Sequence, residues 1–134
     1  MRYGLISDIH GNLEALEAAL GELAKERIDE YLCIGDIVGY GANPKECIKI
    51  VRELKPKALI AGNHEWGILG FLNPDYFNEY AREAIRWTKN VLSLRELEYL
   101  KSFKLTWVDK KITLVHGSLD EPEEFNFIRK LSLR

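Results

Sequence analysis

Three short apolar segments in the first half of the chain each end in glycine and small polar residues. The segments cover residues 2–6, 30–34 and 57–61, and each has the length and flanking residues of a buried parallel strand. Apolar residues recur at helical spacing between them, with Asn12 placed to cap the first helix and Pro44 to open the second. This β-α-β-α-β order predicts an α/β domain with a parallel sheet and right-handed crossovers.

The second half of the chain predicts more helices and a β-hairpin. A helical apolar pattern covers residues 78–92, and a shorter helix is expected around Leu97. Residues 103–108 and 111–115 predict a β-hairpin, and residues 121–131 are a further helix candidate with little periodicity. Because no linker or repeat separates these elements, we expect a single domain over all 134 residues.

The charge and composition of the chain indicate its cellular location and the classes of partner that it can bind. The net charge is −2 with both signs mixed along the chain, so there is no basic surface for general nucleic-acid binding. The start of the chain leaves no room for a signal peptide, and no apolar run approaches the length of a membrane span. Cys33 and Cys47 lie at expected core positions and indicate neither a disulfide framework nor a zinc cluster. We expect a soluble, cytoplasmic protein with no membrane partner.

Side chains that can bind metal follow four of the five predicted strands. Asp8 and His10 come directly after the first strand, Asp36 after the second, and Asn63 after the third, while His116 follows the second strand of the hairpin. All three histidines of the chain fall in these strand-end motifs. Ligands bind at the carboxyl ends of the strands in open α/β sheets, so these side chains are expected at one rim. Their oxygen and nitrogen donors suit manganese, iron or zinc better than calcium.

Each motif also has a structural interpretation when it is taken alone. Asp8 could cap a helix, Asp36 could be a turn residue, and His116 could be structural. Glu65, next to His64, is expected to be a first-turn acid of a helix rather than a ligand. Three aromatic residues could wall a substrate pocket or could pack beside the sheet: Tyr40, Trp66 and Phe71.

In series, the motifs D-x-H, G-D, G-N-H-E and V-H-G resemble those of the calcineurin-like metallophosphoesterases. The match runs from Leu5 to about Gly117. The second motif, G-D-I-V-G-Y-G, is most similar to that of the small prokaryotic phosphodiesterase-like members. The family has a four-layer αββα sandwich, and the predicted β-α-β-α-β start with a later hairpin would be its N-terminal portion.

The resemblance implies a centre with two divalent metal ions. Manganese is the expected ion, with iron, zinc, nickel, cobalt and magnesium as other candidates. The ions would share a hydroxide that attacks a phosphate ester, and His64 would be the catalytic residue beside them. The implied ligands are Asp8, His10 and Asp36 for the first ion, and Asp36, Asn63 and His116 for the second.

Two departures from the family pattern affect these expectations. Serine/threonine protein phosphatases carry aspartate and arginine where this chain has Gly39 and Tyr40, so we expect no phosphoprotein phosphatase of that type. The family's last motif, G-H-x-H, is missing, because no histidine follows His116. Each ion would then keep three protein ligands. We therefore expect a C-terminally truncated or frame-shifted form of a longer protein, with an unpaired sheet edge that could form a homodimer.

The predicted function is hydrolysis of a phosphate ester, either a diester or a monoester, of unspecified identity. Two alternatives stay open: a non-catalytic scaffold or interaction module on the same fold, and an inactive fragment of a longer enzyme. Nuclease action would share the chemistry but lacks the expected basic groove, so nucleic acid is the less favoured partner.

Overall fold

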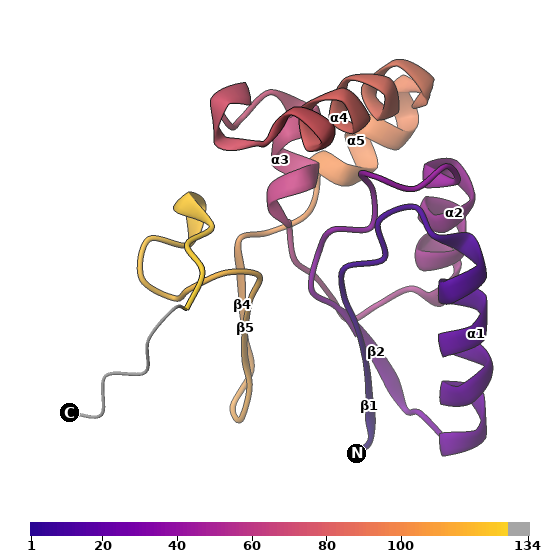
Figure 1. Ribbon diagram of the computed structural model, residues 1–134. Coiled ribbons are helices and arrows are strands. Elements are labelled where there is room, and N and C mark those ends of the chain that lie inside the picture. Colours follow the sequence, from indigo (N-terminus) through magenta and orange to yellow (C-terminus); the bar gives the residue numbers. More distant parts are fainter. Residues whose placement is uncertain (129–134) are drawn as a thin grey trace.

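A parallel sheet of three strands forms the centre of the protein, in a computed structural model that describes residues 1–128 (Figure 1). The strands β1 (Tyr3–Ile6), β2 (Glu30–Cys33) and β3 (Ala58–Leu59) lie side by side in that order. All three run parallel, as the sequence predicts. The strands therefore deliver the loops that follow them to one end of the sheet.

Two helices make the crossovers between these strands and cover one face of the sheet (Figure 1). The helix α1 (Leu13–Leu23) begins where the Asn12 side chain accepts a hydrogen bond from the Ala15 N–H at 3.1 Å. The helix α2 (Pro44–Leu54) has Pro44 at its first position, where the missing N–H costs nothing. The predicted β-α-β-α-β start is thus confirmed.

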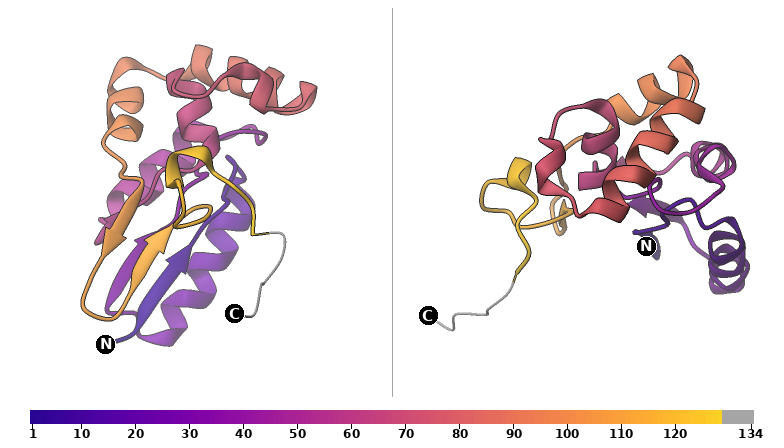
Figure 2. Two further views of the ribbon diagram at one scale, coloured as in Figure 1. Left: turned by 90° about the vertical axis from the view of Figure 1, so that its left-hand side faces the viewer. Right: turned by 45° about the horizontal axis from the view of Figure 1, so that its top comes forward.

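Three further helices gather beyond the carboxyl ends of the strands (Figures 1 and 2). The helix α3 (Asn63–Leu69) follows β3 almost directly. The helices α4 (Glu79–Val91) and α5 (Leu94–Lys101) match the two helices expected from the apolar periodicity. A turn at Pro74–Tyr76 separates α3 from α4.

The predicted hairpin forms a second, two-stranded sheet. Its strands β4 (Thr106–Val108) and β5 (Thr113–Val115) are antiparallel. The Asp109 N–H donates to the Ile112 carbonyl at 2.9 Å and closes the turn. The hairpin lies on the face of the parallel sheet opposite α1 and α2, which gives the N-terminal portion of the expected αββα sandwich (Figure 1).

Apolar side chains fill the space on both faces of the parallel sheet. Cys33 and Cys47 are fully buried on the helix side, as expected for small core residues. On the hairpin side Leu32 and Ile60 are fully buried, and Leu114 of β5 packs against them. The two sheets are thus joined by a core of their own.

The expected helix over residues 121–131 is wrong for the part that the structure describes. Only the turn Pro122–Glu124 is helical, and residues 129–131 lie outside the described residues. Glu121 and Phe125 on either side have φ angles of 47° and 50°, and such left-handed residues end a right-handed helix.

The strand β1 is an edge of the parallel sheet, and the side chain of Leu5 in it is 53% exposed.

Across residues 1–128, the helices fall short of the length and apolar character needed to cross a lipid bilayer.

The core between the two sheets makes a first prediction. Leu114→Ala should lower the free energy of unfolding by about 2–5 kcal/mol, because it removes a buried side chain and leaves a cavity. Val108→Ala, at a position 70% exposed on the partner strand, should cost less than about 1 kcal/mol. Urea unfolding followed by circular dichroism measures both values, and equal costs would contradict the packing of the hairpin against the sheet.

Candidate metal centre

The structure brings all six predicted site residues to one cavity at the carboxyl end of the parallel sheet. The segments that follow β1, β2, β3 and β5 contribute to its walls, together with the turn before α4 and the start of that helix. The cavity has a volume of about 810 Å³, within the range of small-molecule sites. All six predicted residues are among those that line it: Asp8, His10, Asp36, Asn63, His64 and His116.

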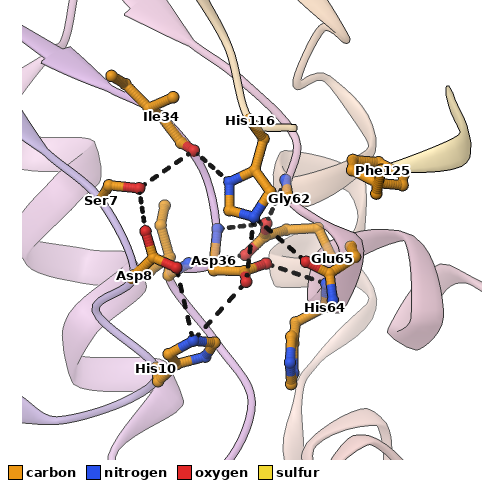
Figure 3. A network of polar contacts seen from close by, with 12 residues as sticks. Ser7, Asp8, His10, Ile34, Asp36, Gly62, His64, Glu65, His116 and Phe125 are labelled. Carbon is orange, nitrogen blue, oxygen red and sulfur yellow. Dashed lines mark hydrogen bonds and ion pairs between the residues drawn. The ribbon is translucent and has the colours of Figure 1, made fainter. Parts of the chain in front are cut away.

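Asp36 lies at the centre of the group (Figure 3). It is 3% exposed, and its Oδ1 accepts a hydrogen bond from the backbone N–H of His64 at 3.0 Å. Its other oxygen, Oδ2, lies 3.3 Å from His116 Nε2 and 3.7 Å from His10 Nε2. One oxygen is therefore fixed to the start of α3, while the other faces two imidazoles.

Backbone carbonyls orient both imidazoles. His10 Nδ1 lies 3.2 Å from the Val38 carbonyl, and His116 Nδ1 lies 2.6 Å from the Ile34 carbonyl. A carbonyl oxygen only accepts, so Nδ1 carries a proton in each ring and donates a hydrogen bond to the carbonyl. This leaves Nε2 to face the cavity, which is the orientation that protein–metal sites use.

The remaining candidate donors lie beside these imidazoles. Asp8 Oδ1 is 3.9 Å from His10 Nε2, and the Ser7 hydroxyl donates to its other oxygen (Figure 3). Asn63 Oδ1 is 3.2 Å from His116 Nε2. The side chain of Asp8 is 60% exposed, which is more than the side chains of His10 (25%), His116 (11%) and Asp36 (4%).

Two groups of three residues could each hold an ion, because the donor atoms within each group lie within 4.8 Å of one another. Asp36 belongs to both groups. One group pairs Asp36 with His10 and His64, and the other pairs it with Asp8 and His116. The resemblance implies a different division, with Asp8 beside His10. Both divisions share the central carboxylate, and the mixture of carboxylate and imidazole donors fits divalent ions such as manganese.

Asp36 and His116 shift each other's titration. Burial acts to raise the pKa of Asp36, but the hydrogen bond and positive charge of His116 hold that pKa below its usual value. Burial acts to lower the pKa of His116, and Asp36 outweighs it and raises that pKa to about 9. With this raised pKa, His116 also carries a proton on Nε2 at neutral pH. A metal ion that binds Nε2 must displace that proton, so binding is coupled to proton release.

His64 is packed among aromatic rings at the cavity wall. It is 4% exposed, and its ring centroid lies 4.6 Å from that of His10, 4.8 Å from Tyr40 and 5.5 Å from Phe77. Burial lowers its pKa, which favours a neutral ring. Its Nδ1 finds no hydrogen-bond partner among the described residues. A Cβ at Gly39 would lie 2.2 Å from this nitrogen, so the ring occupies the space that a side chain at position 39 would need.

Glu65 has a larger role than its sequence position indicates. It is fully buried, and its carboxylate accepts hydrogen bonds at 2.8 Å from the N–H groups of Gly62, Asp36 and Ile37. Burial and the charge of Asp36 raise its pKa to about 7. The expected first-turn position is confirmed, but no local pattern in the sequence indicates that the side chain also holds the loop after β2.

Several site residues adopt left-handed backbone conformations. The φ angles are 53° at Asp8, 49° at His10, 52° at Asp36 and 60° at Tyr40. Residues other than glycine rarely adopt such angles, and where they do they often cluster at functional sites.

Of the three aromatic candidates, Tyr40 lines the cavity, whereas Trp66 and Phe71 do not appear among its described lining residues. These two rings pack on each other at a centroid distance of 5.6 Å. The sequence did not indicate that Tyr76 and Phe77 also line the cavity.

The buried role of Glu65 can be tested by a single-atom change. Glu65→Gln replaces one accepting oxygen with an NH₂ group that faces N–H donors, which should cost about 1–3 kcal/mol of unfolding free energy. Glu96 is a matched control because it is the equivalent acid of the α5 capping box but is only partly buried. Glu96→Gln should change stability by less than about 0.5 kcal/mol. Equal effects in urea unfolding would rule out the organising role.

The contact between Gly39 and His64 makes a second prediction. Gly39 and Gly70 both have positive φ angles, 92° and 78°, but a Cβ at Gly70 would meet nothing within 4 Å. Gly70→Ala should therefore cost only the backbone strain, about 1–2 kcal/mol. Gly39→Ala should cost more and should shift the imidazole NMR signals of His64. Equal costs with unchanged signals would contradict the contact.

Comparison with known proteins agrees with this architecture. The family model of the calcineurin-like phosphoesterases matches residues 1–134. An uncharacterized protein of Methanocaldococcus jannaschii is 42% identical over 128 residues, which cover 92% of this chain and 52% of that protein. The crystal structure of a metallophosphoesterase from Sphaerobacter thermophilus superposes with a TM-score of 0.81 at 44% identity, covering 96% of this chain and 51% of that one. A symmetrical bis(5'-nucleosyl)-tetraphosphatase of Coxiella burnetii is 28% identical over 91% of this chain and 43% of that enzyme.

The chain thus spans about half the length of the curated relatives it matches. These relatives are archaeal and bacterial, in agreement with the prokaryotic subgroup that the second motif resembles. The family model, the relatives and the fold agree, and the chain belongs to the calcineurin-like phosphoesterase family.

Proposed function

We propose that this chain hydrolyses phosphate esters with the help of two divalent metal ions, most favourably manganese. One observation carries the proposal: Asp36 Oδ2 lies within 3.7 Å of two imidazole Nε2 atoms that both face the cavity. A carboxylate shared between two sets of donors is what a two-ion site requires. The proposed ligands are Asp8, His10, Asp36, Asn63 and His116.

In the proposed reaction, Asp36, the two carbonyl-bound histidines and His64 have different roles. When bound, the ions lower the pKa of coordinated water and polarise the oxygens of the phosphoryl group. Asp36 holds the two donor groups together, and the carbonyl-bound histidines keep their Nε2 atoms aimed at the cavity. His64 lies beside His10, where its ring can donate a hydrogen bond to a phosphoryl oxygen or a proton to the leaving oxygen.

The named relatives bear on the substrate class. The Coxiella burnetii relative is named as a bis(5'-nucleosyl)-tetraphosphatase, so nucleoside polyphosphates are candidate substrates beside simple mono- and diesters. The mixed charge of the chain favours such small esters over nucleic acid.

A non-catalytic scaffold or an inactive fragment is the second candidate. No histidine follows His116, so each proposed ion has three protein ligands, and binding would be weaker than with four. The clustering of imidazoles and carboxylates around Asp36 favours the hydrolase, because a scaffold needs no such cluster.

We also propose the homodimer that the sequence predicts through an unpaired sheet edge, and we assign that edge to β1, an edge of the parallel sheet on which Leu5 is exposed. Light scattering after size-exclusion chromatography at high protein concentration tests it, and a clean monomer would contradict it. A cytoplasmic location stays a prediction from the sequence, which cell fractionation would test.

Metal content and turnover together test the proposed function. After loading with manganese, the wild-type chain should hold close to two ions and hydrolyse bis-p-nitrophenyl phosphate or p-nitrophenyl phosphate. His64→Ala should retain the ions but lose about 10²–10⁴-fold in turnover. Asp36→Ala should lose both ions. Asp120→Ala serves as the control, since it changes an exposed carboxylate that does not line the cavity.

Elemental analysis and a chromogenic assay supply both readouts. Full turnover in His64→Ala would contradict the role of His64. Less than one ion per wild-type chain, with no turnover, would favour the scaffold or fragment instead.

A further inference from the structure

Two chemically different sets of side chains line the cavity. The proposed metal ligands are one set. The second set, called the aromatic wall below, is Tyr40, Tyr76 and Phe77. The rings of this wall follow one another through His64: the centroid distances are 4.8 Å from Tyr40 to His64, 5.5 Å from His64 to Phe77, and 4.9 Å from Phe77 to Tyr76.

Two rings of the aromatic wall keep much of their surface free. Tyr40 is 52% exposed and Tyr76 is 40% exposed, whereas Phe77 between them and the core is only 6% exposed. Phe77 is therefore a core residue that supports the wall. The tyrosines offer apolar surface to whatever enters the cavity.

Local structure constrains both tyrosines in the absence of a ligand. Tyr40 has a φ angle of 60°, a conformation that glycine or asparagine adopts more easily. The Tyr76 hydroxyl donates to the Phe125 carbonyl at 3.2 Å, which fixes the ring across the turn while part of its surface stays exposed. Rings that are already positioned lose little entropy when a ligand packs on them.

We propose that this cavity selects phosphate esters whose organic part is a flat ring, which packs on Tyr40 and Tyr76 while the phosphate lies at the metal ligands. This deepens the proposed function and rests on it. The ring of Tyr40 lies 5.2 Å from that of His10 and 4.8 Å from that of His64. A flat group attached at the ester oxygen, or one or two atoms beyond it, therefore reaches the aromatic wall.

Non-hydrolysable phosphonates test the proposal without any need for turnover. Three ligands are titrated by calorimetry into the manganese-loaded chain: phenylphosphonate, cyclohexylphosphonate and methylphosphonate. The first two have rings of similar size, but only phenyl is flat. Phenylphosphonate should bind about 3- to 10-fold more tightly than cyclohexylphosphonate, the size of one aromatic contact.

Variants of the wall assign the preference to its residues. Tyr40→Asn keeps a residue that tolerates the left-handed backbone and removes the ring. Tyr76→Leu keeps apolar bulk and removes flatness. Each should reduce the phenyl-to-cyclohexyl ratio and leave the affinity for methylphosphonate within about 2-fold, because the phosphonate contacts are untouched. Tyr80→Leu, at a position 79% exposed outside the cavity, is the matched control and should leave the ratio unchanged.

Equal binding of the two ring ligands to the wild type would overturn the proposal, as would an unchanged ratio in both wall variants. Methylphosphonate separates this failure from failure of the proposed function. If it binds but the ratio is one, the wall has no selectivity and the metal site stands. If neither methylphosphonate nor inorganic phosphate binds, the metal site itself fails and the ring proposal falls with it.

Discussion

The buried carboxylate of Glu65 is the contact on which the site depends. It accepts N–H groups from the loop after β2 and from the turn before α3, two segments that are distant in sequence. Asp36 returns the connection, because its Oδ1 accepts the N–H of His64. The two carboxylates thus lock the segments to each other in both directions. The distance between Asp36 and Asn63 is then set by the folded backbone, so these two candidate ligands are positioned before an ion binds.

The site gathers buried carboxylates and left-handed backbone conformations at one end of the parallel sheet, and the apolar cores on both faces of the sheet stabilise them. Buried acids and left-handed residues each cost stability. On one face of the parallel sheet, α1 and α2 bury a large apolar core, and on the other face the hairpin buries a second one around Leu32 and Leu114. The strands run between these cores, so their carboxyl ends are held rigidly. The strained loops can therefore keep their conformations at the end of the sheet.

The sequence predicted those features that are written in local patterns. Strands and crossover helices were recognisable because a buried strand is a short apolar run and an amphipathic helix repeats every three to four residues. The ligand candidates followed from their places after those strands. The hydrogen bonds of Glu65 could not be foreseen, because its partners Asp36 and Ile37 are 28 or 29 positions away. Tyr76 reaches the cavity only through the path of the turn between α3 and α4. The helix expected after residue 121 fails because of the backbone angle at Phe125, which apolar periodicity does not encode.

His116 connects the site to the order in which the chain can assemble. Its Nδ1 bonds the carbonyl of Ile34, a residue 82 positions earlier, and it arrives on β5 of the hairpin. Contacts of such long range close large loops and form late in folding. Loop closure of this length favours an order in which the N-terminal β-α-β-α-β unit brings Asp8, His10 and Asp36 together first and the docking hairpin adds His116. An ion held through His116 would bind the docked state and not the undocked one, so it would act as a clasp that strengthens the union of the two sheets.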